Sequence, residues 1–507
     1  MKKYNQKNSI VIIMLLIISF LIVACDDEQT ELSKYLKKAE MEYEQISIQM
    51  GEAYWNLYSD ESIADLETPK ERYVKLFTND TLNYLIDDWY QKRTTIKNDT
   101  LMRRVEVWHN ILTAANVNYS DDNLEIQSKL EFWLAEDDTV VGRPSQEEME
   151  SMVVQLMKKR DKKAIELGYD NYGELILEVT ETGYDWFANF AKTIDDRTYE
   201  PYKNLIDELK DSGEITEFNT PEMRSLMMQY YTNQITPRVA GDSIQVAMKM
   251  ILESIGIDYD NLPIRFIENE MPPGIGGQGI AVQIPNDIRV ALMPGMDFPT
   301  WMHELGHGLQ AMNTEVDVPI LKGYEWSLGS MCGGYAEGLA EVSAKFSVSK
   351  DWVNQLSPIS EEQLIDMEIN TNKYRPVFLR MWLNQFMFEF EYYKNTDQDP
   401  VELRRKLTQE YMMLDSPQER VRPIANMAVV SYPLYTQNYL IAEILSWQVH
   451  ETLRDKFGES YATNSAVGDF LKEHFYKDGN LLPWQQYLNK ATGRELDVDG
   501  YLTHYEL

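Results

Sequence analysis

The chain has 507 residues, and its 44% hydrophobic content is sufficient for a large core. With 48 Lys and Arg against 82 Asp and Glu, the formal net charge is −34. This charge argues against nucleic acid as a partner, because binding depends on neutralising phosphates with Lys and Arg. It also argues against a broad electrostatic hold on anionic lipid.

Residues 1–24 have the pattern of an export signal. Three lysines among the first seven residues precede an apolar run at Ile10–Val23, which is shorter than the roughly 20 residues that a membrane-spanning helix needs. The run ends Leu-Ile-Val-Ala-Cys25, which is typical of a bacterial lipobox. We therefore expect cleavage before Cys25 and lipidation of its thiol, giving an exported lipoprotein tethered to a membrane of the cell envelope. An uncleaved anchor or a plain secretory signal is the alternative.

After lipidation only Cys332 remains as a free thiol, so no intramolecular disulfide is expected despite the oxidising export route. Cys332 is predicted to be a small buried residue. Residues 25–507 contain no internal repeat or long linker, and they could form one large domain or two lobes, with the segment at about 263–350 holding the strongest functional motif.

Amphipathic helices dominate the mature chain. Apolar residues recur with helical period through most of it, and short turns separate the segments. The fold class is therefore predicted to be mainly α, and the helices are expected at residues 36–58, 68–94, 103–116, 146–167, 374–392, 400–412 and 439–457.

The pattern changes near residue 263. Residues 271–279 contain a formal GxGxxG, but a dinucleotide site requires a strand before it and a helix opening at it. Here prolines precede the motif and strand-like residues 280–284 follow it. We instead expect a small sheet whose glycines let a peptide backbone come close. A substrate could add to its edge as a further strand, with Gln278, Ile280 and Val282 as candidate contacts.

The sequence Thr300–Gln310 holds the strongest functional motif. His303 and His307 are four residues apart, so on a helix they share one face and can bind one metal ion, with Glu304 beside it. The chain has only 6 histidines, so chance placement is a minor alternative, as is a pair of ordinary surface histidines. A strand at residues 288–293 and a helix N-cap at Asp297 are expected just before it.

Two glycines in this helix need a reason. Gly306 and Gly308 each cost about 1 kcal/mol relative to alanine in a helix interior. Their presence predicts that another element packs very close to the helix.

A third ligand is expected because catalytic zinc usually takes three protein ligands and leaves one position open. Asn313 stands where the metzincin motif has histidine. A later helix offers Glu337 as the ligand and, one turn on, Glu341 as the acceptor that orients a histidine ring. Glu315 and Glu325 are weaker alternatives. One Zn2+ per chain is therefore predicted, beside a helix with an apolar stripe at Tyr335, Leu339, Val342 and Phe346.

The pairing of HELGH with a later EGLAE resembles the gluzincin peptidases. Further stretches resemble the angiotensin-converting enzyme (peptidyl-dipeptidase A) family, at residues 43–56, 167–172, 432–451 and 483–493. This resemblance implies a large two-lobed helical zincin with a deep central cleft and a zinc-dependent peptidase activity on short peptides, with release of C-terminal dipeptides.

By the same resemblance, a tyrosine upstream of Gln-x-His-Glu hydrogen-bonds the oxyanion, and that spacing selects Tyr439. Tyr435 is the nearest substitute, and His450 is expected to be structural. The family also has a substrate-binding histidine on its edge strand and another before the tyrosine. Neither occurs here, at positions 276–282 or 421–438. The family's carboxylate-gripping lysine is not evident either, although Arg420 and Arg422 are possible substitutes.

The hypothesis favoured by these residues is a peptidase in which Glu304 is the general base and Tyr439 the oxyanion donor. Two alternatives stay open. One is an endo-acting oligopeptidase of a related helical family, and the other is a non-catalytic lipoprotein that keeps the fold and binds peptides.

Overall fold

The computed structural model describes residues 2–59, 64–135, 140–234, 237–271, 275–357, 359–415 and 424–507, with backbone only for residues 2–27 and Asp121. Within these ranges no helix combines the length and the apolar character that crossing a membrane would need. The predicted lipidation residue Cys25 falls among the residues whose side chains are not described, and Arg420 and Arg422 lie outside the described ranges.

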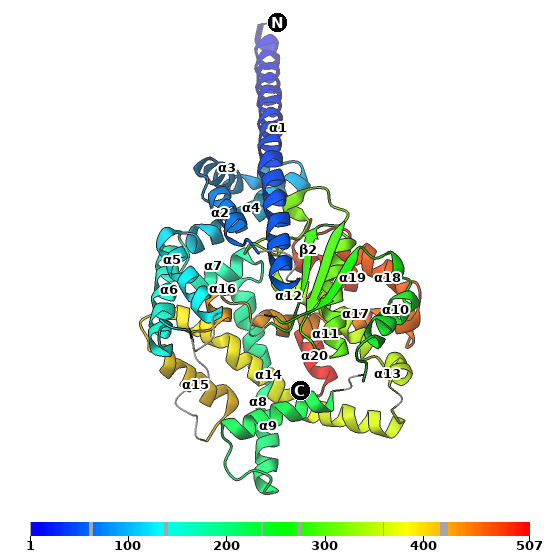
Figure 1. The fold of residues 1–507 in the computed structure, drawn as a ribbon. Coiled ribbons are helices and arrows are strands. Elements are labelled where there is room, and N and C mark those ends of the chain that lie inside the picture. The colour runs from blue at the N-terminus through cyan, green and yellow to red at the C-terminus, as the bar shows by residue number, and fades with distance from the viewer. Residues whose placement is uncertain are drawn as a thin grey trace.

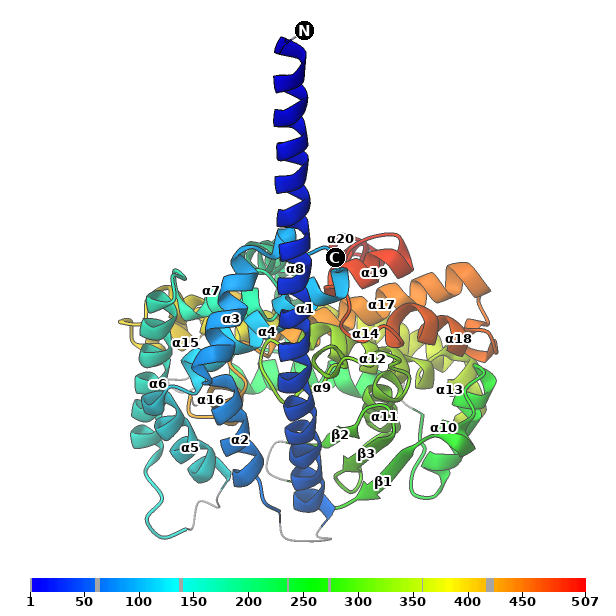
Figure 2. The ribbon, with the colours of Figure 1, turned by 90° about the horizontal axis from the view of Figure 1, so that it is seen from above.

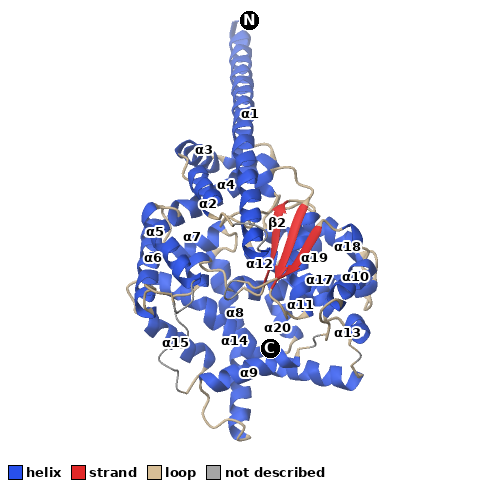
Figure 3. Ribbon diagram, viewed as in Figure 1, coloured by secondary structure: helices blue, strands red, loops and turns tan. Residues whose placement is uncertain are grey.

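The fold is mainly α, as predicted (Figure 3). The α-helices of the first half are α1 (Lys2–Ser59), α2 (Glu67–Phe77), α3 (Asp80–Gln91), α4 (Asp99–Asn118), α5 (Asp121–Ala135), α6 (Gln146–Glu166), α7 (Tyr172–Val179), α8 (Tyr184–Asp211), α9 (Thr220–Asn233) and α10 (Ser243–Ser254). Those of the second half are α11 (Phe298–Met312), α12 (Gly333–Ser347), α13 (Lys350–Leu356), α14 (Glu361–Lys394), α15 (Pro400–Met412), α16 (Met427–Ser431), α17 (Gln437–Phe457), α18 (Val467–Leu471), α19 (Trp484–Thr492) and α20 (Val498–His504).

Predicted helix boundaries were wrong at three places. Helix α1 is continuous from Lys2 and so begins well before residue 36, where the sequence pattern suggested it. The run at 68–94 breaks into α2 and α3, because the Asn79 side chain accepts the Leu82 N–H and caps a new helix. Helix α14 begins thirteen residues before position 374, at a capping box formed by Ser360 and Gln363. The first turns of α14 bury little, so apolar periodicity did not reveal them.

A three-stranded sheet interrupts the helices, as predicted. Its strands are β1 (Ile264–Glu268), β2 (Gly277–Gln283) and β3 (Asp287–Leu292), in the order β1-β3-β2. Strand β1 is parallel to β3, and β2 is antiparallel to it. Strand β2 is therefore an edge strand with no second strand partner among the described residues.

The arrangement places the sheet beside the long first helix. Helix α1 is one continuous helix. Its N-terminal part projects from the body, and its C-terminal part lies beside β2 (Figures 1 and 2). There a Cβ at Gly51 would lie 2.9 Å from the Cα of Val282, so α1 and β2 are in near backbone contact. A second core cluster joins α1 to α2 and α4 around Tyr43, whose ring meets Trp108 edge-on at 5.9 Å.

Candidate metal centre

Helix α11 carries the histidine pair and begins as the sequence predicts. Strand β3 ends at Leu292, and the Asp297 side chain then accepts the Thr300 N–H at 3.0 Å as the N-cap. The rings of His303 and His307 lie on one face of α11 with their centroids 5.0 Å apart. Both side chains are mostly buried, so the helix presents two imidazoles to the interior.

Helix α12 brings Glu337 to this pair. Its Oε2 lies 3.2 Å from His303 Nε2 and 3.8 Å from His307 Nε2. One potential ligand atom from each of the three side chains falls within 4.8 Å of the others. The structure thus brings together the three residues that the sequence suggested as ligands.

Glycines allow the two helices to approach this closely. A Cβ at Gly306 would lie 2.7 Å from the Cα of Ala340 on α12, far inside van der Waals contact. A Cβ at Gly308 would lie 3.0 Å from Ile264 of β1, so the opposite side of α11 is pressed on the sheet. The prediction that another element packs very close to both glycines is confirmed.

The outer nitrogens of both imidazoles face carboxylates. His303 Nδ1 lies 3.1 Å from Glu341 Oε1, and His307 Nδ1 lies 3.8 Å from Glu325 Oε1. A proton on His303 Nδ1 that is donated to Glu341 leaves the lone pair of Nε2 free to face Glu337, whereas His307 Nδ1 makes no hydrogen bond. Glu325 is thus at an outer position rather than a ligand position, and Glu315 is paired with Lys472.

The donor set fits a divalent cation. Glu337 Oε2 is buried and makes no hydrogen bond, although two imidazole nitrogens surround it. Burial by itself would raise the pKa of Glu337, but the attraction of the His303 and His307 imidazoles and the hydrogen bond from Tyr435 outweigh it and lower the pKa to about 2. Two imidazoles and one anionic oxygen are the ligands that catalytic zinc takes in proteins.

Glu304 lies beside these three residues and is itself buried. Burial raises its pKa to about 7, the nearby Glu337 carboxylate adds to the rise, and His303 opposes it. Strand β2 covers this carboxyl: a Cβ at Gly277 would lie 2.9 Å from Glu304 Cγ, and one at Gly279 would lie 2.9 Å from His307 Cβ. The glycines of the formal GxGxxG thus let β2 lie directly on α11.

Two tyrosines lie near the centre, Tyr435 just before α17 and Tyr439 in its first turn. Tyr435 donates its hydroxyl proton to Glu337 Oε1 at 2.6 Å. Tyr439, the residue selected by resemblance, is 41% exposed, and its ring lies 5.8 Å from that of Tyr435 and 5.3 Å from Trp382. Partial burial raises the pKa of the Tyr439 hydroxyl, and the negative charges of Glu337 and Glu304 raise it further. Tyr439 is therefore close enough to interact electrostatically with these two carboxylates.

The suggested substrate contacts on β2 are placed differently from one another. Gln278 accepts a hydrogen bond from Tyr58 Oη at 2.6 Å. Ile280 and Val282 are buried in a small cluster with Trp55. Their side chains therefore face the core, and only their backbone groups remain for contact with a peptide.

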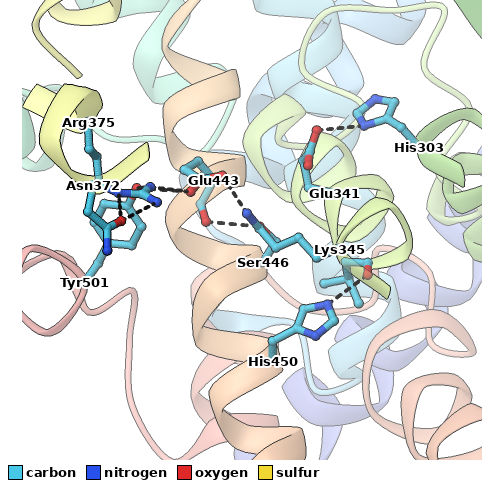
Figure 4. Close-up of polar contacts among 10 residues, drawn as sticks. His303, Glu341, Lys345, Asn372, Arg375, Glu443, Ser446, His450 and Tyr501 are labelled. Atoms are coloured by element: carbon cyan, nitrogen blue, oxygen red, sulfur yellow. Dashed lines mark hydrogen bonds and ion pairs between the residues drawn. The ribbon is translucent and has the colours of Figure 1, made fainter. Parts of the chain in front are cut away.

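A charged network behind the centre was not anticipated from the sequence. Figure 4 shows His303 joined to Glu341, and Lys345, one turn further along α12, directed at Glu443 of α17. Lys345 Nζ lies 2.7 Å from Glu443 Oε2, and Arg375 of α14 lies 3.4 Å from the other oxygen. No short motif marks such a set, because its members come from three helices far apart in sequence.

The other two residues discussed from sequence are buried. His450 lies between the Val342 carbonyl, 2.9 Å from its Nε2, and the Tyr461 hydroxyl, 2.8 Å from its Nδ1. Cys332 is a buried free thiol at the N-cap of α12, as predicted.

Known proteins resemble this chain in its second half by sequence and along most of its length by fold. The model of the family described as "Peptidase family M3" matches residues 281–507, which include all the residues of the centre. No curated protein matches the sequence.

Three solved structures illustrate the fold. Metallocarboxypeptidase 1 of Trypanosoma cruzi is 12% identical with a TM-score of 0.65, covering 94% of this chain and 99% of its own. The M32 carboxypeptidase of Deinococcus radiodurans is 13% identical with a TM-score of 0.60, covering 94% and 100%. A candidate oligoendopeptidase F is 14% identical with a TM-score of 0.65, covering 94% and 92%. At these identities the likeness concerns the fold, and none of the three carries the name of the converting-enzyme family.

Proposed function

We propose that this protein is a zinc-dependent peptidase that hydrolyses bonds within short peptides. The observation that carries the proposal is the convergence of His303, His307 and Glu337, with the buried carboxyl of Glu304 beside them. The match of residues 281–507 to a peptidase family supports it.

The chain's own residues divide the chemistry. His303, His307 and Glu337 would hold zinc, which supplies a Lewis acid able to lower the pKa of water to about 7 and polarise a carbonyl. Glu304 accepts a proton from the attacking water and delivers it to the leaving amine. Its pKa of about 7 suits both transfers.

The two tyrosines take different roles. Tyr435 already donates its proton to Glu337, so it orients a ligand. Tyr439 is exposed beside it and is our candidate for stabilising the oxyanion of the tetrahedral intermediate.

Strand β2 is the candidate platform for the peptide backbone. Met293 N–H donates to the Gly276 carbonyl, so alternation along an antiparallel pair turns the backbone groups of Gly277, Gly279 and Ala281 away from β3. The Gly279 N–H is directed at Glu304, which places this outer edge on the side of the centre. A peptide can add there as a strand through main-chain hydrogen bonds.

The decisive experiment replaces Glu304 by glutamine. Glu304→Gln should keep zinc bound and slow peptide hydrolysis by at least about 10²-fold, because only the base is lost. Turnover is measured by mass spectrometry of a peptide mixture with and without chelator. Glu315→Gln is the matched control, since Glu315 is exposed and paired with Lys472. Unchanged turnover in Glu304→Gln would refute Glu304 as the base.

The same mixture separates the remaining alternatives. An enzyme that releases C-terminal dipeptides should not cleave peptides whose C-terminal carboxylate is amidated. An endo-acting oligopeptidase should cleave the free and the amidated peptide alike. A metal-replete protein that binds peptides and cleaves none would favour the non-catalytic alternative.

We further propose that the protein is exported and lipidated at Cys25. The lipobox at residues 21–25 supports this. Detergent partitioning of the wild type and of Cys25→Ser tests it. Equal partitioning into the aqueous phase would overturn it.

A further inference from the structure

The segment before Tyr435 has an unusual backbone. Tyr435 lies in the connection between α16 and α17, yet its hydroxyl must stay on Glu337 at 2.6 Å. The preceding residue, Leu434, has φ 51°, in the left-handed region that non-glycine residues seldom occupy. Such a conformation is strained and persists only where the surroundings impose it.

Two side chains hold Leu434 in this conformation. Glu389 of α14 accepts the Leu434 N–H at its Oε2 at 3.1 Å, and Gln437 of α17 donates its Nε2–H to the Leu434 carbonyl. Leu434 and Glu389 are both buried. Both backbone groups of the strained residue are therefore bound by side chains that belong to different helices.

The contact between Glu389 and Leu434 has a geometric consequence. It fixes the residue next to Tyr435, the tyrosine whose hydroxyl meets a proposed metal ligand.

We propose that Glu389 is a positioning residue for the metal centre. It holds Leu434 in the left-handed conformation, this conformation directs the Tyr435 hydroxyl at Glu337, and Glu337 is thereby kept in place for the ions and substrates of the peptidase. This inference rests on the proposed function through the role of Glu337.

The test compares four variants in a competitive zinc titration and in peptide turnover. Glu389→Gln keeps an acceptor for the Leu434 N–H and should stay within about 3-fold of the wild type. Glu389→Leu has no acceptor and should lose roughly 10-fold or more in zinc affinity, the range seen when a group that orients a metal ligand is removed. Tyr435→Phe should show a similar loss. The double variant Glu389→Leu/Tyr435→Phe should be no worse than Tyr435→Phe alone, because both changes remove the same contact.

Asp161→Leu is the matched control. Asp161 is also buried and accepts one backbone N–H, that of Tyr172 at the start of α7. The Asp161→Leu variant should have a lower unfolding temperature than the wild type and the same zinc affinity in its folded state. If Glu389→Leu does not fold, Glu389→Asp shortens the acceptor by one methylene and should give a smaller loss in the same direction.

Two results would overturn the inference. One is wild-type zinc affinity in Glu389→Leu or, where Leu does not fold, in Glu389→Asp. The other is a double variant whose loss equals the product of the two single losses. Either would leave the proposed function intact, whereas a wild type that neither binds zinc nor cleaves peptides would remove the proposed function itself.

Discussion

Replacing Gly306 by alanine tests whether the contact between α11 and α12 sets the geometry of the centre. The new Cβ would lie 2.7 Å from the Cα of Ala340, 2.8 Å from its carbonyl oxygen and 2.9 Å from Ser343 Oγ. Carbon atoms pack best at about 3.5–4.0 Å, so the two helices must separate by roughly 0.8 Å. That separation moves Glu337 away from His303 and His307.

The expected magnitude follows from two opposing contributions. Alanine gains about 1 kcal/mol over glycine in a helix interior. Overpacking against a backbone that cannot rotate away costs about 1–3 kcal/mol. Gly308→Ala is the matched control on the same helix, because its Cβ would meet Ile264 Cδ1 at 3.0 Å and Ile288 Cγ2 at 3.4 Å, both movable side-chain ends.

Gly306→Ala should therefore be less stable than Gly308→Ala by about 1–3 kcal/mol in urea unfolding. Its zinc affinity should fall by roughly 10-fold or more, since a ligand shell about 1 Å too loose loses function. Gly308→Ala should keep the affinity of the wild type. If the two variants agree in both measurements, the contact with Ala340 does not determine the ligand geometry.

Other predictions concern the groups around this contact. Glu341→Ala should weaken zinc binding by about 10–100-fold in a chelator competition, because Glu341 accepts the outer ring proton of His303, and an unchanged affinity would exclude that role. Burial lowers the pKa of His450 to about 3, so the folded state binds fewer protons than the unfolded state between that value and about 6.5, and stability falls as pH falls through this window. Between pH 7 and pH 5 this group should contribute a loss of about 2 kcal/mol that His450→Gln lacks, measured as the difference in urea unfolding of the two metal-free proteins. Removal of metal by chelator should abolish turnover and lower the unfolding temperature, and re-added zinc should restore both.

The parts of the centre that could be predicted are those encoded over short distances. The spacing of His303 and His307 places them on one helix face whatever surrounds the helix. Gly306 and Gly308 lower the stability of an isolated helix, so their presence predicts close packing against another element. The sequence does not show which element packs there. The boundaries of α6 and α15 followed the apolar pattern. The pattern failed where α1 continues from Lys2 and where a cap or an exposed first turn interrupted it, as at Asn79 and in α14.

The parts that could not be predicted depend on how distant helices meet. Tyr435 and Tyr439 are four residues apart in sequence, and the hydroxyl that meets Glu337 is that of Tyr435, which follows the left-handed residue Leu434. The pairing of Lys345 with Glu443 likewise requires α12 and α17 to lie side by side. Neither of these two contacts can be predicted from a pattern of neighbouring residues in the sequence.

The centre lies within a stack of four packed elements, β2, α11, α12 and α17, and a glycine lies at each contact between them. Strand β2 meets α11 at Gly279, α11 meets α12 at Gly306, and α12 meets α17 at Gly338, where a Cβ would lie 2.8 Å from Leu445. At the first two of these contacts the backbones are separated by little more than atomic contact, so the main chain fixes where the Cα atoms of His307 and Glu337 lie, and side-chain contacts such as that of Tyr435 then orient the ligands. Tyr439, in contrast, is a half-exposed side chain in the first turn of α17. Tyr439→Phe should therefore lower kcat by about 10²–10³-fold, the range for removal of one oxyanion donor, while zinc affinity in a chelator competition stays near the wild-type value, because this side chain does not contact the ligands.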